Sequence, residues 1–261
     1  LEQALLFIIN IYIRWNEVYR EMNICALEER SLSEYPGHVA CTIYTDGCNF
    51  KCPYCSHKSI RDGVAMPVIS EEDFFKFLDK AAEEKSLDSV VIKGGEPTLH
   101  KELPDLIRHI KGYYGFKVKI CTNSSNITMI DEFLCEGMID YIAMDIKAGH
   151  SGYAKLAGTE IDEGVIASIR GCLDLFEGKF EGLPLFPYEF RTTVVGGLHT
   201  DEDFREIGEL IDGIKRYVLV PYKPCGEECA ETKGLYTPSM EELLRYKEII
   251  APHVETVEIR A

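Results

Sequence analysis

The sequence predicts an α/β protein, folded as a partial barrel of six βα units. The first observation is that apolar segments of strand length alternate with helical patterns from Val39 onward. The second is that these segments are apolar on both faces, which is typical of parallel strands buried beneath helices. Parallel strands need right-handed crossovers, and six such units can curl into an open barrel. A chain of 261 residues suits one such domain.

Six segments carry the strand pattern, and several helix starts are marked. The predicted strands are 39–45, 89–94, 116–122, 141–147, 188–195 and 216–222. Segment 254–260 alternates polar and apolar residues, so we expect one more strand at the sheet edge. Ser70 and Thr200 each stand three residues before an aspartate, at capping-box distance, and Thr237 precedes Pro238 as a third expected helix start.

We expect residues 1–21 to be an N-terminal extension outside the core and residues 22–261 to form the domain, because Met22 begins the stretch that leads into the first strand. Segment 1–13 is apolar like part of a secretory signal, but it lacks a basic start and a small-residue cleavage site. The alternative is an amphipathic helix that covers the bottom of the barrel.

The charge and cysteine content narrow the possible partners. A net charge of −16 repels polyanions, so we expect no nucleic acid and no anionic membrane surface as a partner. No apolar run approaches the eighteen or so residues of a membrane span. Three of the ten cysteines lie within eight residues, which favours metal ligation in a reducing cytoplasm over disulfides.

The candidate site residues follow the predicted strands. In parallel α/β folds, ligands bind at the carboxyl ends of the strands, so loops from all six units should converge on one face. Cys48, Cys52 and Cys55 lie in the loop after the first predicted strand. A four-iron cluster normally takes four cysteine thiolates, and three leave one iron open for a ligand. An open metal position is typical of a catalyst.

The spacing in GCNFKCPYC (47–55), read with GGEP (94–97), resembles the radical S-adenosylmethionine (SAM) superfamily. The resemblance implies a partial TIM-like barrel of the radical SAM type, a [4Fe-4S] cluster on the three cysteines, and SAM bound at the open iron. Further segments, SLSEYPG, VVIKGGEPTL, YIAMDIKA and FRTTVVGGLHTDEDF, are similar to activating proteins of anaerobic ribonucleotide reductase. These proteins are a branch of the glycyl-radical-enzyme activases.

The resemblance also implies roles for residues in the first two loops. Tyr54 matches the aromatic position near the SAM adenine, and its alternative is an ordinary loop aromatic. Gly94 and Gly95 would let the backbone approach SAM, and Glu96 would hold the SAM ammonium. A simple strand-ending turn would explain the glycines but not the acid.

Residues of the later loops match the family in the same way. Thr122, Asn123 and Ser124 resemble the segment that contacts the ribose, although turn chemistry favours the same residues. Arg191 would face the SAM carboxylate, or pair with an acid inside the barrel.

Asp145 and Lys147 match the D-x-K of the activases, where the aspartate helps to bind a monovalent cation beside SAM; the alternative is a buried salt bridge. Two positions depart from the pattern. Cys121 stands where an aspartate is common, which removes an expected ligand of that cation, and Lys223 stands where a histidine is often found.

Cys225 and Cys229 are two further thiols after the last predicted strand of the barrel. Two cysteines alone cannot hold a second four-iron cluster. Their role is left open between a redox or metal function and ordinary surface cysteines.

The function implied by the resemblance is reductive cleavage of SAM to a 5′-deoxyadenosyl radical, which generates a glycyl radical on an anaerobic ribonucleotide reductase. The partners would be that large glycyl radical protein and an electron donor such as ferredoxin or flavodoxin, and no catalytic residue is expected beyond the cofactors. One alternative is a radical SAM enzyme for a small molecule, such as a 7-carboxy-7-deazaguanine synthase. Another is a noncatalytic iron–sulfur or zinc module, with His57 as a fourth zinc ligand.

Overall fold

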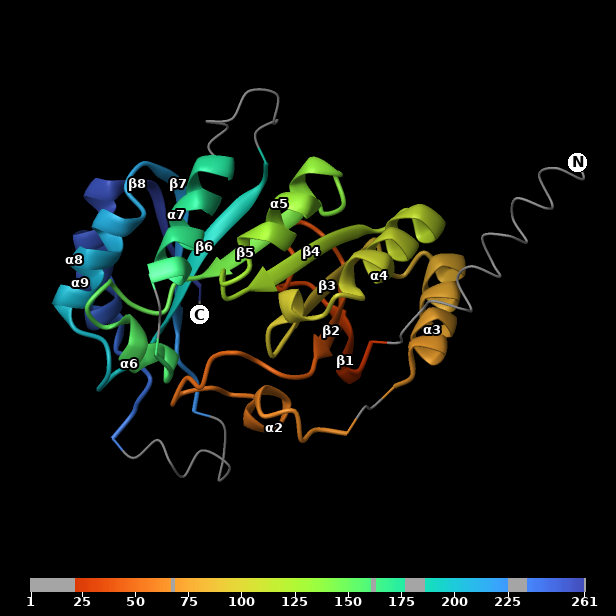
Figure 1. Ribbon diagram of the computed structural model, residues 1–261, viewed down its shortest axis with the longest axis horizontal. Helices are drawn as coiled ribbons and strands as arrows, with labels where there is room; N and C mark the ends of the chain where they lie inside the picture. The colour runs from red at the N-terminus through yellow and green to blue at the C-terminus, as the bar shows by residue number, and fades with distance from the viewer. Residues whose placement is uncertain (1–21, 67–68, 161–162, 177–185, 225–233, 261) are drawn as a thin grey trace, which may run out of the picture.

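The computed structural model describes residues 22–66, 69–160, 163–176, 186–224 and 234–260, and these form one sheet wrapped by helices (Figure 1). The expected extension, residues 1–21, lies outside the described residues, as do Cys225 and Cys229. The strands are β1 (Ile24–Ser31), β2 (Ala40–Thr45), β3 (Ser89–Gly94), β4 (Lys117–Thr122), β5 (Tyr141–Asp145), β6 (Tyr188–Val194), β7 (Ile214–Pro221) and β8 (Val254–Ile259).

Helices connect successive strands and cover one face of the sheet. They are α2 (Lys58–Arg61), α3 (Glu71–Glu84), α4 (Leu103–His109), α5 (Ile127–Cys135), α6 (Tyr153–Ala157), α7 (Glu163–Phe176), α8 (Asp201–Leu210) and α9 (Met240–Ile250), with short helical turns η1 (Pro97–Leu99), η2 (Ile110–Tyr114) and η4 (Ala251–His253). Figure 1 shows α3, α4, α5, α7, α8 and α9 arranged around the outside of the strands. Among the described residues, no helix is long and apolar enough to cross a membrane.

The strands lie side by side in chain order, from β1 to β8. Strands β2 to β8 are parallel, and β1 is antiparallel to β2. Because parallel strands in chain order need crossovers of one hand, the long connecting helices lie on the same face, and the sheet bends into a barrel. Among the described strands β1 and β8 do not pair with each other, so the barrel stays open.

All six predicted strands and the edge strand are confirmed, with ends shifted by up to two residues. The predicted strand 141–147 ends earlier, at Asp145, so Lys147 lies in the loop beyond it. β1 was not predicted. Its ICALEERS sequence forms a half-exposed edge strand, so it lacks the continuous apolar run of the buried strands.

Two of the three expected helix starts are confirmed. Ser70 caps α3, and Thr200 caps α8 with a complete capping box. The third expectation was wrong, because α9 is capped by Ser239, whose side chain accepts from the amide of Glu242. The serine also meets the capping-box pattern, and it stands directly before the first helical residue, whereas Thr237 lies two residues further upstream.

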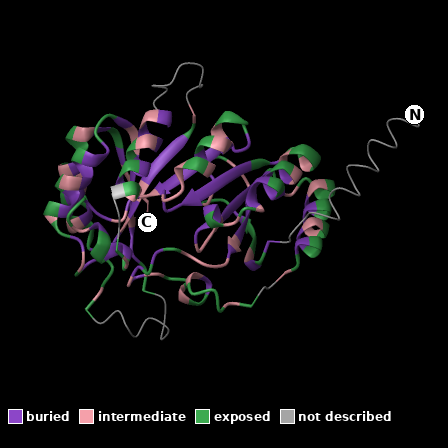
Figure 2. Ribbon diagram, viewed as in Figure 1, coloured by how far each residue is buried: buried purple, intermediate pink, exposed green. Residues whose placement is uncertain are grey.

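The two faces of the sheet have different cores. The outer face packs against the helices in the large apolar core, and Figure 2 shows the central strands buried. The inner face holds a smaller cluster, formed by Tyr35, Ala40, Val91, Cys121, Tyr141 and Ala143. Because side chains alternate along a strand, the same alternation that buries Val91 turns Lys93 toward the barrel interior.

A buried charge cluster joins the inner face to the sheet edge. The Glu189 carboxylate of β6 accepts from both terminal nitrogens of Arg260, at 3.0 and 2.8 Å, and from the Tyr141 hydroxyl at 3.0 Å. Lys119 of β4 approaches the same carboxylate at 3.4 Å. Arg260 directly follows β8, so this cluster ties the last strand to the middle of the sheet.

Candidate active site

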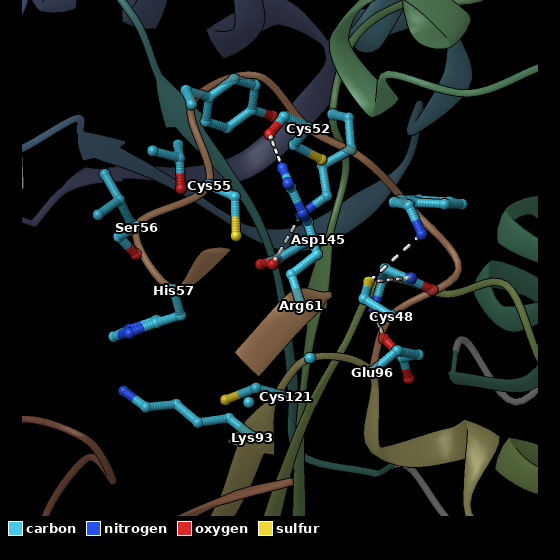
Figure 3. Close-up of a pocket in the computed structure, with 18 of the residues that line it drawn as sticks. Cys48, Cys52, Cys55, Ser56, His57, Arg61, Lys93, Glu96, Cys121 and Asp145 are labelled. Atoms are coloured by element: carbon cyan, nitrogen blue, oxygen red, sulfur yellow. Dashed lines mark hydrogen bonds and ion pairs between the residues drawn. The ribbon is translucent and has the colours of Figure 1, made fainter. Parts of the chain in front are cut away.

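A cavity of about 480 Å³ opens at the carboxyl ends of the strands (Figure 3). Its volume lies in the range of about 300–1,000 Å³ that is typical of ligand pockets. The cavity is lined by all but one of the residues predicted for the site, namely Cys48, Cys52, Tyr54, Cys55, Gly94, Gly95, Glu96, Thr122, Asn123, Asp145, Lys147 and Arg191. Ser124 is the exception.

Backbone hydrogen bonds hold the cysteine loop over the cavity. The amide of Gly47 donates to the carbonyl of Ile60 in α2, and the amide of Glu96 donates to the carbonyl of Gly47, both at 2.8 Å. Further along the loop, the amide of Lys51 donates to the carbonyl of Ala157 in α6 at 2.7 Å. The loop is therefore fixed to three other segments of the chain.

Glycines allow these close approaches. A Cβ on Gly95 would lie 1.7 Å from the carbonyl oxygen of Gly47, and a Cβ on Gly158 would lie 2.0 Å from that of Lys51. Gly94 has φ +138, and its Cβ would meet the backbone of Thr45 at 2.3 Å. The two glycines of GGEP thus have a structural role that was not predicted: Gly94 lets the end of β3 approach the end of β2, and Gly95 lets it approach the cysteine loop.

Cys48, Cys52 and Cys55 are free cysteines, and Figure 3 shows their sulfur atoms around the cavity. Burial raises the pKa of the Cys48 thiol to about 11 and also raises that of Cys52. Thiols this buried become thiolates when a metal supplies the compensating charge. The backbone amide of Phe50 approaches the sulfur of Cys48 at 3.4 Å, as donors near cluster ligands do. These three residues fit a cluster.

The structure gives no support for a zinc site that uses His57. Among the described residues, no three histidine, cysteine, aspartate or glutamate side chains converge as ligands of a single metal ion. A zinc ion needs its ligands around one centre, whereas each cysteine of an iron–sulfur cluster binds a different iron.

Glu96 is buried at the bottom of the cavity, with 1% of its surface exposed. One carboxylate oxygen accepts from the hydroxyls of Thr98 and Thr122, at 2.5 and 2.6 Å, and from the amide of Thr98. The other accepts from the amide of Asn123 at 2.6 Å. Burial raises the pKa of Glu96, although these donors act against it. The second oxygen has capacity for another donor, such as an ammonium group.

The CTNSS segment contributes to the site unevenly. Thr122 and Asn123 line the cavity. The side-chain nitrogen of Asn123 donates to the side-chain oxygen of Asn49 in the cysteine loop at 2.7 Å. Ser124 has φ +69 and is buried outside the cavity lining. The left-handed backbone conformation of Ser124 is uncommon for a residue other than glycine, and the residue types alone do not reveal it.

Asp145 lies between two cations. Arg191 donates to one of its oxygens, and Lys147 donates to the other at 3.0 Å. Although burial acts in the opposite direction, the charges of Arg191 and Lys147 hold the pKa of Asp145 well below its usual range. Both ion pairs were alternatives in the sequence prediction. The carboxylate expected to bind a monovalent cation is already neutralised by the protein.

Two tyrosines form an apolar wall with polar tips. Tyr54 and Tyr222 line the cavity with their ring centres 6.5 Å apart, and both are almost fully buried. Their hydroxyl groups have no hydrogen-bond partner among the described residues. Such orphaned hydroxyls fit a site that receives a polar ligand.

The cavity also contains residues that the sequence did not single out for it. They are Glu34, Tyr44, Phe50, Ser56, Arg61, Lys93, Thr193, Val220, Pro221 and Tyr222. His57, the alternative zinc ligand, and the two departures already noted, Cys121 and Lys223, also line the cavity. Period-two alternation along the predicted strands could have identified Lys93 and Tyr44 as inward residues. Glu34 carried no such signal, because it reaches the cavity from the loop between β1 and β2.

Comparison with known proteins adds a family to this geometry. The model of the radical SAM superfamily matches residues 42–211, which include the cysteine loop, GGEP, the D-x-K segment and Arg191. The chain belongs to the radical SAM superfamily. Radical SAM proteins use a [4Fe-4S] cluster and SAM, and the free cysteines, the buried acid and the orphaned hydroxyls of this cavity fit those two groups.

Two relatives differ in how much of the chain they match. A proposed glycyl-radical enzyme activating enzyme of Methanocaldococcus jannaschii is 28% identical over 242 residues, which are 91% of this chain and 95% of that protein. A protein of Pyrococcus horikoshii assigned as a GTP 3′,8-cyclase is 24% identical over 159 residues, 60% of this chain and 47% of that protein.

Solved structures support the radical SAM fold. SuiB of Streptococcus suis, solved with its precursor peptide SuiA, has a TM-score of 0.60 and 18% identity over 84% of this chain. The match covers 48% of SuiB, so this chain spans about half of it. SuiB solved with S-adenosylmethionine gives a TM-score of 0.57 and 17% identity, covering 82% of this chain and 48% of SuiB.

Proposed function

We propose that this radical SAM protein is a glycyl-radical-enzyme activase and that its target is an anaerobic ribonucleotide reductase. The observation that carries the proposal is the match to the M. jannaschii protein, which extends over nearly all of both chains. The match to the GTP 3′,8-cyclase covers only part of each chain. The cavity is open at the strand ends, where an extended loop of a partner could enter.

In this proposal, the cluster is held by Cys48, Cys52 and Cys55. When bound, the cluster and SAM supply a 5′-deoxyadenosyl radical that abstracts a hydrogen atom. The loop that carries the cysteines is fixed by backbone contacts at Gly47, Gly95 and Gly158, so the three cysteines that would hold the cluster keep their position relative to the end of β3. No protein side chain is proposed as a catalyst.

Different residues are proposed to contact the charged and the neutral parts of SAM. Glu96 receives the ammonium with its second oxygen, and Arg191 with Lys147 faces the carboxylate, because Asp145 leaves this trio with one net positive charge. Gly94 and Gly95 present their backbone to SAM, and Thr122 and Asn123 contact the ribose.

Tyr54 packs against the adenine in this proposal. The hydroxyl groups of Tyr54 and Tyr222, which have no partner among the described residues, can then form hydrogen bonds with SAM. Since these rings are almost fully buried, they also exclude water from that side of the site. Ser124 has no proposed contact with SAM, and no monovalent cation is required beside Asp145.

The proposal extends to the cell and to the rest of the chain. We expect a cytoplasmic protein that receives electrons from a ferredoxin or flavodoxin. We also expect it to bind neither nucleic acid nor membranes, because its net charge of −16 repels polyanions. Met22 is buried and its amide donates to Glu71, so the proposed domain includes Met22. That residues 1–21 form an extension outside this domain is part of the same proposal.

The experiment combines the reduced protein with SAM and the anaerobic reductase encoded in the same genome, in the absence of oxygen. A glycine-centred doublet in the electron paramagnetic resonance spectrum is expected, and deuterium placed on the glycine Cα should appear in 5′-deoxyadenosine. Cleavage of SAM without deuterium transfer, accelerated instead by a purine or GTP, would favour the small-molecule enzyme as the correct assignment.

A further inference from the structure

One side of the cavity carries polar groups that no proposed cofactor contact uses. Figure 3 shows Lys93, His57 and Cys121 there, away from Cys48 and Glu96. Lys93 is the last residue of β3 before the glycine pair. Its register partner in β2 is Tyr44, which also lines the cavity.

The Lys93 ammonium is held in place but keeps donors for a ligand. It donates to a side-chain oxygen of Glu34 at 2.6 Å and lies 5.0 Å from the centre of the Tyr44 ring. Its side chain is 19% exposed. An ammonium group has three N–H donors, and Glu34 accepts one of them. Among the described residues the ammonium donates to no second acceptor, and Lys93 lines the cavity, so two donors remain for a ligand.

Glu34 holds the Lys93 ammonium in position, and contacts inside the barrel fix the segment that carries Glu34. Its carbonyl accepts from the ammonium of Lys119 at 2.7 Å, and Lys119 belongs to the buried charge cluster around Glu189. The next residue, Tyr35, is buried inside the barrel against the ring of Tyr141 at 5.6 Å. The SLSEYPG segment, which the proposed SAM and cluster contacts do not use, therefore places a carboxylate beside Lys93.

The charges on this side favour a neutral ligand over an anion. The Glu34 carboxylate neutralises Lys93, so a phosphate would meet a negative charge next to the ammonium. A carbonyl oxygen can accept from the ammonium without that repulsion.

We propose that Lys93, positioned by Glu34, binds a backbone carbonyl oxygen of a polypeptide substrate in this cavity. The inference rests on the proposed function, in which the substrate is a glycine in a protein loop. In this proposal the substrate binds on the side of the cavity where Lys93 lies, away from Cys48 and Glu96.

The test uses the reconstituted full chain, SAM, and the capped peptide acetyl-Ala-Gly-Ala-amide with deuterium on the glycine Cα. The rate of deuterated 5′-deoxyadenosine formation is measured against peptide concentration. Lys93→Met should raise the KM for the peptide about ten- to a hundredfold, because a hydrogen bond from a charged group is lost. Lys93→Arg should restore part of the affinity, and Glu34→Gln should raise KM less than Lys93→Met.

Lys80→Met is the matched control, because Lys80 is exposed on α3 and does not line the cavity. It should leave the KM unchanged, and iron content checks that each variant is assembled. An unchanged KM in Lys93→Met, with deuterium still transferred, would overturn this inference and leave the proposed function standing. Both the inference and the proposed function are overturned if the wild-type protein transfers no deuterium from the peptide or the reductase, and if GTP accelerates SAM cleavage in the wild type but not in Lys93→Met.

Discussion

At the scale of single residues, Glu96 combines two roles. The resemblance implied an acid that holds the SAM ammonium. The structure adds that this buried carboxylate joins the GGEP turn to the CTNSS segment through Thr98, Thr122 and Asn123. A substitution at Glu96 therefore acts on folding as well as on the ligand. Binding measurements need to be paired with stability measurements for this reason.

Glu96→Gln should lower both the free energy of unfolding, by about 1–3 kcal/mol, and the affinity for SAM. The amide places a donor where the carboxylate accepts from the backbone of Asn123 or from the two threonines. Denaturant unfolding and equilibrium binding of SAM measure the two effects. Thr98→Ser keeps the hydroxyl donor and is the matched control; SAM affinity equal to wild type in a folded Glu96→Gln variant would remove Glu96 from the SAM site.

The resemblance to the radical SAM superfamily predicted about half of the side chains that line the cavity, but not their partners. Asp145, Lys147 and Arg191 were predicted from the resemblance, and all three line the cavity. Their mutual ion pairs depend on the sheet register that places Asp145 opposite Arg191, which a single sequence does not contain. Glu34 was missed because its loop folds back into the barrel from the opposite end.

At the scale of elements, the position of the cysteine loop depends on glycines in its neighbours. Gly95 permits a backbone approach that any side chain would block. The spacing of the cysteines was visible in the sequence, but the contact between Gly95 and Gly47 was not, since it joins two segments that are far apart along the chain.

Gly95→Ala should reduce the iron bound per protein and the rate of SAM cleavage, because the added Cβ would lie 1.7 Å from the carbonyl oxygen of Gly47 and displace the loop. Gly112→Ala is the control, since a Cβ at Gly112 would meet no atom within 4 Å. Iron analysis after anaerobic reconstitution checks the prediction. Wild-type iron content in Gly95→Ala would show that the loop position does not depend on this contact.

The start of α9 gives a test of the corrected helix boundary. Ser239→Ala should lower the free energy of unfolding by about 1 kcal/mol, because the cap to the amide of Glu242 is lost. Thr237→Ala should change little, since Thr237 lies outside the helix and is exposed. Urea unfolding of the two variants compares them directly; a larger loss for Thr237→Ala would restore the boundary expected from the sequence.

At the scale of the whole molecule, the repeated βα order could be predicted because every buried strand is a short apolar run between helical patterns. The two edge strands, β1 and β8, were harder to predict. β8 alternates clearly, whereas β1 carries consecutive charged residues and resembles a loop in sequence. The buried charges that hold β8 to the sheet come from three distant segments, so no local pattern predicts them.

Glu189 should make the stability of the whole barrel depend on pH. Burial favours its neutral form, but Arg260 and Lys119 lower the pKa of Glu189 to about 2 from the ordinary value of 4.5. A lowered folded-state pKa stabilises the protein above the ordinary value, and this contribution is lost as the pH falls from about 4.5 toward 2.

Glu189→Gln should lower the unfolding free energy at neutral pH by about 3 kcal/mol, because Arg260 and Lys119 lose their buried partner. It should also flatten the loss of stability in acid. Glu83→Gln, at an exposed position on α3, is the control. Equal acid sensitivity of wild type and Glu189→Gln would show that other carboxylates dominate the acid response.

The central claim is that Cys48, Cys52 and Cys55 hold a cluster that cleaves SAM in this cavity. The most direct measurement is the iron content of protein reconstituted without oxygen, together with 5′-deoxyadenosine formed after reduction with dithionite. About four irons per chain and slow SAM cleavage are expected for the wild type and for Cys135→Ala, an exposed cysteine on α5. Alanine at position 48, 52 or 55 should abolish both. Stoichiometric zinc without iron in protein purified anaerobically, or full SAM cleavage by these three variants, would contradict the account.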